Sequence, residues 1–131
     1  QRKGLVTAIG EFISNAEGGS GGRILFDHPD MPGVDENKSI NIYRIIQEVV
    51  HNCLKHAKAS RLDIHFGLRH EMLTITCRDN GVGFDPIKTT RESEGIGLRS
   101  LRNRTAMMDG NLTIETKKGK GTIFLFEIPM K

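Results

Sequence analysis

The feature that most constrains the fold is a continuous apolar stripe that predicts one long helix after residue 39. Apolar side chains recur three and four residues apart through the whole segment. They are Ile42, Ile45, Ile46, Val49, Val50, Cys53, Leu54 and Ala57. A helix with one apolar face must pack that face against another layer. Ser39, just before the stripe, is the expected N-cap of this helix.

Segments that alternate apolar and polar residues supply the other layer. Residues 61–68 and 72–78 alternate with period two, and the polar residues between them predict an antiparallel hairpin. A second hairpin is expected from residues 112–115 and 122–128, and one more strand from residues 23–27. A short helix is expected over residues 4–16, ended by the glycine-rich residues 17–22. Another follows from Leu98 and is ended by Gly110.

This order of elements predicts the α+β class. Hairpins dominate over parallel strand–helix–strand units, so we expect a two-layer sandwich with a mixed, mostly antiparallel sheet of about five strands. Three helices would cover one face of that sheet. The 131 residues suffice for one domain with a single core, over residues 1–131.

Composition disfavours several other classes of protein. The net charge of +3 is too small to indicate DNA binding, and an aromatic content of 5% without Trp disfavours a platform for single-stranded nucleic acid. No apolar run approaches the roughly 18 residues of a membrane span. Cys53 and Cys77 lack the partner spacing of a metal site, so we expect reduced core thiols in a cytoplasmic protein.

Two glycine-rich segments suggest a nucleotide pocket. Residues 79–83 read Asp-Asn-Gly-Val-Gly, and residues 95–98 read Gly-Ile-Gly-Leu. Glycines let the backbone approach a ligand closely, and a buried carboxylate beside them can accept a hydrogen bond from an exocyclic amine. Alone, the first segment could be a turn that leaves a strand. The second lacks the pattern of a dinucleotide-binding fingerprint.

The long helix carries polar residues along one edge of its apolar stripe. Glu48, Asn52 and His56 follow one another at steps of four residues, and Lys55 lies beside them. The amide oxygen of Asn52 suits Mg²⁺, and the carboxylate of Glu48 could orient or deprotonate a nucleophile. A solvated polar flank is the alternative interpretation of the same spacing.

Together these segments resemble the N, G1, G2 and G3 boxes of the catalytic ATP-binding domain of sensor histidine kinases. The four boxes fall at residues 48–57, 79–84, 95–98 and 119–122, and the resemblance covers roughly residues 20–131. The family implies the Bergerat ATPase fold, shared with gyrase, the heat-shock chaperone ATPase and mismatch-repair ATPases.

One subclass fits best, the nitrate-sensor and desaturase-sensor kinases. The similarity lies in Asn52 with Lys55 and His56, and in Arg102 and Arg104 after the second glycine segment. The chain departs from that pattern at residues 100–101, where many members have Gly-Met and this chain has Ser-Leu.

The resemblance implies ATP and Mg²⁺ as cofactors and gives the matching residues roles at the base. Asp79 would accept a hydrogen bond from the adenine amine. Gly81 and Gly83 would let the backbone close over the base, and Thr122 would reach the adenine directly or through water.

The resemblance also implies roles at the phosphates. Asn52 would bind Mg²⁺, while Lys55 and His56 would face phosphates or ribose. Glu48 would act as a base or as an orienting residue. The second glycine segment, Gly95, Gly97 and Leu98, would form the hinge of a lid over residues 85–97 and present backbone amides to the phosphates.

The implied function is transfer of the γ-phosphoryl group of Mg-ATP to a histidine on a separate dimerisation domain of the same parent protein. The phosphoryl group would then pass to a response regulator. The chain begins at Gln1, and no phosphoacceptor histidine box precedes residue 4, so we expect a piece of a longer protein that could be membrane-bound. Residues 1–20 would then be a helix and linker from the dimerisation region.

Two alternatives stay open at this point. One is an anti-sigma-type protein serine kinase of the same superfamily, and the other is a non-catalytic nucleotide-binding interaction module. On any of these interpretations we expect no nucleic-acid partner and no insertion of this segment into a membrane.

Overall fold

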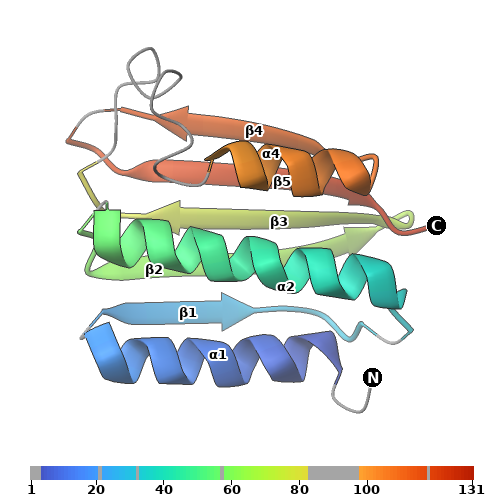
Figure 1. The fold of residues 1–131 in the computed structure, drawn as a ribbon, viewed down its shortest axis with the longest axis horizontal. Helices are drawn as coiled ribbons and strands as arrows, with labels where there is room; N and C mark the ends of the chain where they lie inside the picture. Colours follow the sequence, from blue (N-terminus) through green and yellow to red (C-terminus); the bar gives the residue numbers. More distant parts are fainter. Residues whose placement is uncertain (1–3, 21, 32, 57, 83–97, 118) are drawn as a thin grey trace.

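The fold has two layers, a layer of helices and one five-stranded sheet (Figure 1). A computed structural model describes residues 4–20, 22–31, 33–56, 58–82, 98–117 and 119–131, except for the side chains of residues 20, 55 and 56. The α-helices are α1 (Leu5–Ser20), α2 (Glu36–His51) and α4 (Leu98–Met107). The strands are β1 (Arg23–Asp27), β2 (Arg61–Arg69), β3 (Met72–Asp79), β4 (Asn111–Thr116) and β5 (Thr122–Pro129). The α+β sandwich predicted from the sequence is confirmed.

The sheet is mixed, and β3 lies at its centre. The strand order is β1-β2-β3-β5-β4, in which β1 and β2 are parallel and every other pair is antiparallel. The helix α2 crosses between the parallel pair, whereas β2–β3 and β4–β5 are the two predicted hairpins. Because β3 pairs on both sides, its last residue, Asp79, lies opposite Leu62 of β2 and Thr122 of β5.

The core fills the space between the helices and the sheet. Every second residue of β3 and β5 is buried, as the predicted alternation requires. The stripe of α2 supplies the facing side chains, and Ile42, Ile45, Ile46 and Val49 have no exposed surface. Burying a side chain of this size contributes about 1.5–3 kcal/mol, so this contact fixes α2 on the sheet.

The predicted ends of α1 and α2 were wrong. α2 begins at Glu36 rather than after Ser39, because Asp35 is the N-cap and its carboxylate accepts a hydrogen bond from the Lys38 amide at 3.1 Å. α1 continues through two glycines to Ser20. A carboxylate oxygen of Glu17 accepts from the amide of Ile24 at 2.7 Å, which holds this last turn against β1.

The end of α4 also differs from the prediction. The helix stops at Met107, before the predicted Gly110, and Asp109 adopts a positive φ of 57° in the turn that follows. Gly110 is required for another reason. A β carbon there would lie 2.7 Å from the Glu127 carbonyl oxygen, so only glycine lets the chain pass this close to β5.

The long predicted helix changes its hydrogen bonding at Asn52. A π-helical turn, η1 (Asn52–His56), follows α2, so the regular spacing that predicted a ladder through His56 does not continue past His51. Lys58 then adopts a φ of 54°, and the Ala59 amide donates to the Cys53 carbonyl oxygen at 2.9 Å. Turns of this kind are rare and frequently lie at functional sites.

None of the helices in the described part of the chain combines the length and the apolar character needed to cross a bilayer.

Candidate nucleotide site

Those predicted nucleotide residues that the structure describes lie toward one end of the sheet. There β3 and β4 end, β5 begins, and the chain enters α4 (Figure 1). Asp79 and Thr122 face each other across the β3–β5 pair, and both are buried. Residues that lie far apart in the sequence therefore meet because two hairpins pair side by side.

The carboxylate of Asp79 is held by two donors from different elements. Its Oδ1 atom accepts from the amide of Gly81 at 2.7 Å, and its Oδ2 atom accepts from the thiol of Cys53 at 3.1 Å. Asp79 is only 6% exposed. A buried carboxylate needs such donors, since an unpaired buried charge is costly. The two bonds fix the orientation of the group.

Burial keeps the thiols near this carboxylate protonated. Burial, with the neighbouring Asp79 charge as the second cause, raises the pKa of Cys53 far above its ordinary value. The same two causes raise the pKa of Cys77. The predicted core thiols are confirmed as buried and free, and as thiols they can donate but are poor nucleophiles.

Asn80 joins the end of β3 to the start of β2. Its Oδ1 atom accepts from the amides of Ser60 and Arg61, both at 3.0 Å, and its Nδ2 atom donates to the Ser60 hydroxyl at 3.0 Å. The Asn-Gly pair after Asp79 therefore does not only form a turn, because the Asn80 side chain also connects the end of β3 to the start of β2.

Thr122 lies on the other side of Asp79 and is 4% exposed. Its hydroxyl lies 3.0 Å from the hydroxyl of Thr116 on β4. A buried hydroxyl next to a buried carboxylate is suited to hydrogen bonding with a polar ligand or with an ordered water.

The turn between β4 and β5 packs directly on the segment that follows Asp79. Gly121 has a φ of 86°, and a β carbon there would clash with the carbonyl oxygen of Asp79 and lie 3.2 Å from its carbonyl carbon. Gly119 has a similar φ of 84°, but a β carbon there would meet no atom within 4 Å. The amide of Gly119 donates to the Val82 carbonyl oxygen. Of these two glycines, Gly121 is required both by its backbone angle and by space, and Gly119 by its backbone angle alone.

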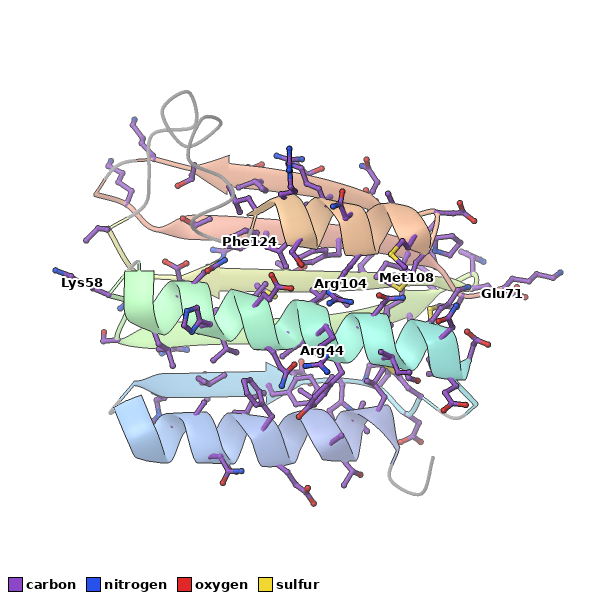
Figure 2. The ribbon with its side chains drawn as sticks, viewed as in Figure 1. Arg44, Lys58, Glu71, Arg104, Met108 and Phe124 are labelled. Carbon is purple, nitrogen blue, oxygen red and sulfur yellow. The ribbon has the colours of Figure 1, made fainter. Side chains whose placement is uncertain are left out.

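Glu48 lies where α2 contacts α4. Its Oε2 atom accepts from the Ser100 hydroxyl at 2.7 Å and from Arg104 Nε at 3.4 Å. The side chain of Arg104 lies between α4 and α2 (Figure 2). Arg104 also donates from Nη1 to the Oδ1 atom of Asn41 at 3.1 Å. These polar contacts link α2 to α4. Ser100 is one of the two residues at which the chain departs from the subclass pattern.

Asn52, the predicted Mg²⁺ ligand, is the first residue of η1. Its Nδ2 atom is buried and has no hydrogen-bond partner among the described residues. Buried polar atoms without partners are rare in native proteins, and an amide N–H of this kind can donate to an oxygen atom of a ligand. The described residues contain no cluster of three or more His, Cys, Asp or Glu side chains that could hold a metal ion.

Several predicted site residues lie partly or wholly outside the described residues. Lys55 and His56 belong to η1, but their side chains are not described. Gly83, Gly95, Gly97 and the predicted lid over residues 85–97 lie outside the described residues altogether. Leu98 is described, as the buried first residue of α4.

Sequence reasoning missed the contacts that support the site. Cys53 was assigned to the core alone, whereas its thiol contacts Asp79. Arg104 was noted as part of a subclass pattern, and Asn41 was not singled out. The helical periodicity of Glu48 gives its face on α2 but cannot reveal which helix packs across that face.

A comparison with protein families decides the identity of this fold. Residues 37–131 match the model of the histidine kinase-, DNA gyrase B- and HSP90-like ATPases. The chain belongs to this ATPase family. The predicted family is thereby confirmed, while the nitrate-sensor subclass stays a prediction.

Relatives of this ATPase domain include sensor kinases of bacilli. The domain is 30% identical over 128 residues to the signal transduction histidine-protein kinase/phosphatase DegS of Brevibacillus brevis, which covers 97% of this chain and 33% of DegS. It is 39% identical over 88 residues to the sensor histidine kinase ComP of Bacillus subtilis, over 67% of this chain and 11% of ComP. The chain thus spans a third or less of the length of these two relatives.

Solved histidine kinases share the fold of this ATPase domain. The histidine kinase domain of the blue-light activated kinase of Erythrobacter litoralis superposes with a TM-score of 0.80 at 22% identity, over 96% of this chain and 61% of that one. The histidine kinase AdeS of Acinetobacter baumannii superposes with a TM-score of 0.77 at 16% identity, over 97% and 64%. These likenesses agree in fold with the ATP-binding domain of sensor histidine kinases.

The Gly121 contact makes a testable prediction. Gly121→Ala should destabilise the domain by roughly 1–3 kcal/mol more than Gly119→Ala, because it adds a backbone clash to the same positive φ. Urea denaturation of both variants measures the difference. Equal losses would show that the turn can move away from Asp79 at no cost.

The α2–α4 contact makes a second prediction. Arg104→Ala should lower the free energy of unfolding by about 1 kcal/mol, since Glu48 and Asn41 each lose a donor at a partly buried contact. The exposed Arg102 is the matched control, and Arg102→Ala should change stability by less than about 0.5 kcal/mol. Indistinguishable denaturation midpoints for the two variants would contradict the proposed contribution of the contact.

Proposed function

We propose that this chain is the ATP-binding catalytic domain of a sensor histidine kinase. It would bind Mg-ATP and transfer the γ-phosphoryl group to a histidine nitrogen on a dimerisation domain of the same parent protein, leaving ADP. The observation that carries the proposal is the buried Asp79 carboxylate, clamped by two donors opposite Thr122 at the end of the sheet. Membership of the ATPase family and the kinase relatives support it.

Base selection would depend on Asp79. Each of its carboxylate oxygens already accepts one hydrogen bond and has room for another, so the group can accept from the 6-amine of adenine. Guanine presents a carbonyl oxygen at that position, which would face the carboxylate without a proton between them. A buried polar group left unmatched in this way gives strong discrimination between ligands.

The phosphate side of the site would be built on η1 and the start of α4. Asn52 would ligate Mg²⁺ through its amide oxygen, and its unpartnered Nδ2 atom would donate to a phosphate oxygen. When bound, Mg²⁺ neutralises phosphate charge and orients the γ-phosphoryl group. We propose that Lys55, His56, Gly95 and Gly97 add phosphate or ribose contacts and that Gly83 closes over the base.

We propose that Glu48 orients groups at the phosphate side. Its Oε2 atom is already engaged by Ser100 and Arg104, which hold the carboxylate in one direction at the contact of α2 with α4. Because α4 begins at Leu98, its N-terminal amides and dipole would favour phosphate at the same end of the helix. Catalysis in this class of reaction consists mainly of positioning and charge neutralisation.

The partners follow from the chemistry. The phosphoryl group would be accepted by a histidine-bearing dimerisation domain and then by an aspartate of a response regulator. A location on the cytoplasmic side, where ATP is available, is part of the same proposal.

The base assignment predicts the behaviour of Asp79→Asn. The variant should weaken ADP binding by about tenfold or more, because an amide presents a donor as well as an acceptor to the adenine amine. Isothermal titration calorimetry with ADP measures the loss. Affinity equal to that of the natural chain would remove Asp79 from the base site, and no binding of ADP by the natural chain at millimolar concentration would refute the proposed function itself.

The metal assignment predicts a different pattern for Asn52→Ala. The natural chain should bind a non-hydrolysable ATP analogue more tightly with Mg²⁺ than without it, and the variant should lose most of that difference. Adenosine carries no phosphate, so its affinity should change by less than about twofold, well within 0.5 kcal/mol. If adenosine and the Mg²⁺ complex weaken equally, Asn52 has a structural role instead.

A further inference from the structure

We infer that Cys53 is a positioning residue for base recognition, because its thiol holds the Asp79 carboxylate in the direction that meets the adenine amine. The inference rests on the proposed role of Asp79 and adds a residue that determines the specificity of that site. It starts from the hydrogen bond that joins the helical layer to the end of β3.

The geometry gives Cys53 a role that packing alone does not require. The thiol lies 3.1 Å from Asp79 Oδ2, while the Gly81 amide occupies Oδ1 at 2.7 Å. The Gly81 amide lies only two residues after Asp79 in the same chain segment, and so it moves with the carboxylate. Cys53 is the donor that comes from the other layer, and it is therefore the one that ties the carboxylate to the rest of the fold.

The thiol is the donor in this contact. Cys53 is 1% exposed, and its sulfur lies 3.1 Å from Asp79 Oδ2. A carboxylate cannot donate in return, which fixes the direction of the bond. The remaining acceptor positions of Asp79 stay available to a ligand.

The contact also sets the spacing between the two halves of the site. Asn52, the proposed Mg²⁺ ligand, immediately precedes Cys53 in the same π-helical turn. The Cys53–Asp79 bond therefore fixes the turn that carries Asn52 relative to the strand end that carries Asp79. Loss of the bond should loosen base recognition first, because the carboxylate loses its direction.

The chain offers a matched control in Cys77. This residue is also a buried, free cysteine, and it lies on the same face of β3 as Asp79, two residues earlier. Among the described residues, the hydrogen bond to the carboxylate comes from Cys53 and not from Cys77. Truncating either cysteine removes the same volume from the core, but only one truncation removes a donor from Asp79.

The test compares ADP with purine riboside diphosphate, which lacks the 6-amine, by calorimetry on the 131-residue chain. Cys53→Ala should weaken ADP binding by about 3- to 10-fold and purine riboside diphosphate by less than about twofold. Cys53→Ser retains a donor and should restore most of the preference for ADP. Cys77→Ala should leave the ratio of the two affinities unchanged.

Each alternative result is decisive. If Cys53→Ala weakens both ligands equally, or weakens neither, the thiol only fills space and the inference is overturned. It is also overturned if Cys53→Ser loses as much of the preference for ADP as Cys53→Ala does. If Cys53→Ala does not fold, Cys53→Val replaces it as a larger apolar variant that leaves no cavity and has no donor. If the natural chain itself shows no preference for ADP, the base assignment of Asp79 fails, and the inference fails with it.

Discussion

The double pairing of β3 is the constraint on which the rest of the structure depends. This strand is hydrogen-bonded to β2 on one side and to β5 on the other, so its register is fixed twice. A shift by one residue would turn Asp79 to the outer face of the sheet and bring Arg78 into the core. The apolar alternation along β3 forbids that shift, and the position of the carboxylate is therefore a consequence of core packing.

Polar contacts between the layers then set the helices in place. Apolar packing holds α2 and α4 against the sheet, and the polar contacts add directional constraints to that packing. The thiol of Cys53 on Asp79 and the pair of Ser100 and Arg104 on Glu48 have one satisfactory arrangement each. Partly buried networks of this kind select a unique geometry because an unmatched member is costly.

Periodic patterns predicted most of the fold, and local chemistry explains the differences. The stripe of α2 and the alternation in both hairpins gave the layers, whereas the helix ends depended on side chains: Asp35 caps α2, and Glu17 carries α1 past two glycines by bonding to β1. The π turn at Asn52 leaves no trace in apolar spacing. The resemblance to the family's sequence boxes pointed to Asp79 and Thr122. Contacts such as that of Arg104 with Asn41 depend on which helices pack together, and the periodicity of the sequence does not contain that information.

The β3–β5 pairing, which connects the two hairpins, has a consequence for folding. Each hairpin closes a short loop and can form early, whereas the β3–β5 pairing joins segments far apart in the chain and must close a long loop at a larger entropic cost. Asp79 and Thr122 come together only when β3 and β5 pair. A molecule that contacts both residues would bind the completed fold and neither hairpin alone. It would therefore stabilise the pairing that carries this entropic cost and shift the folding equilibrium toward the native state.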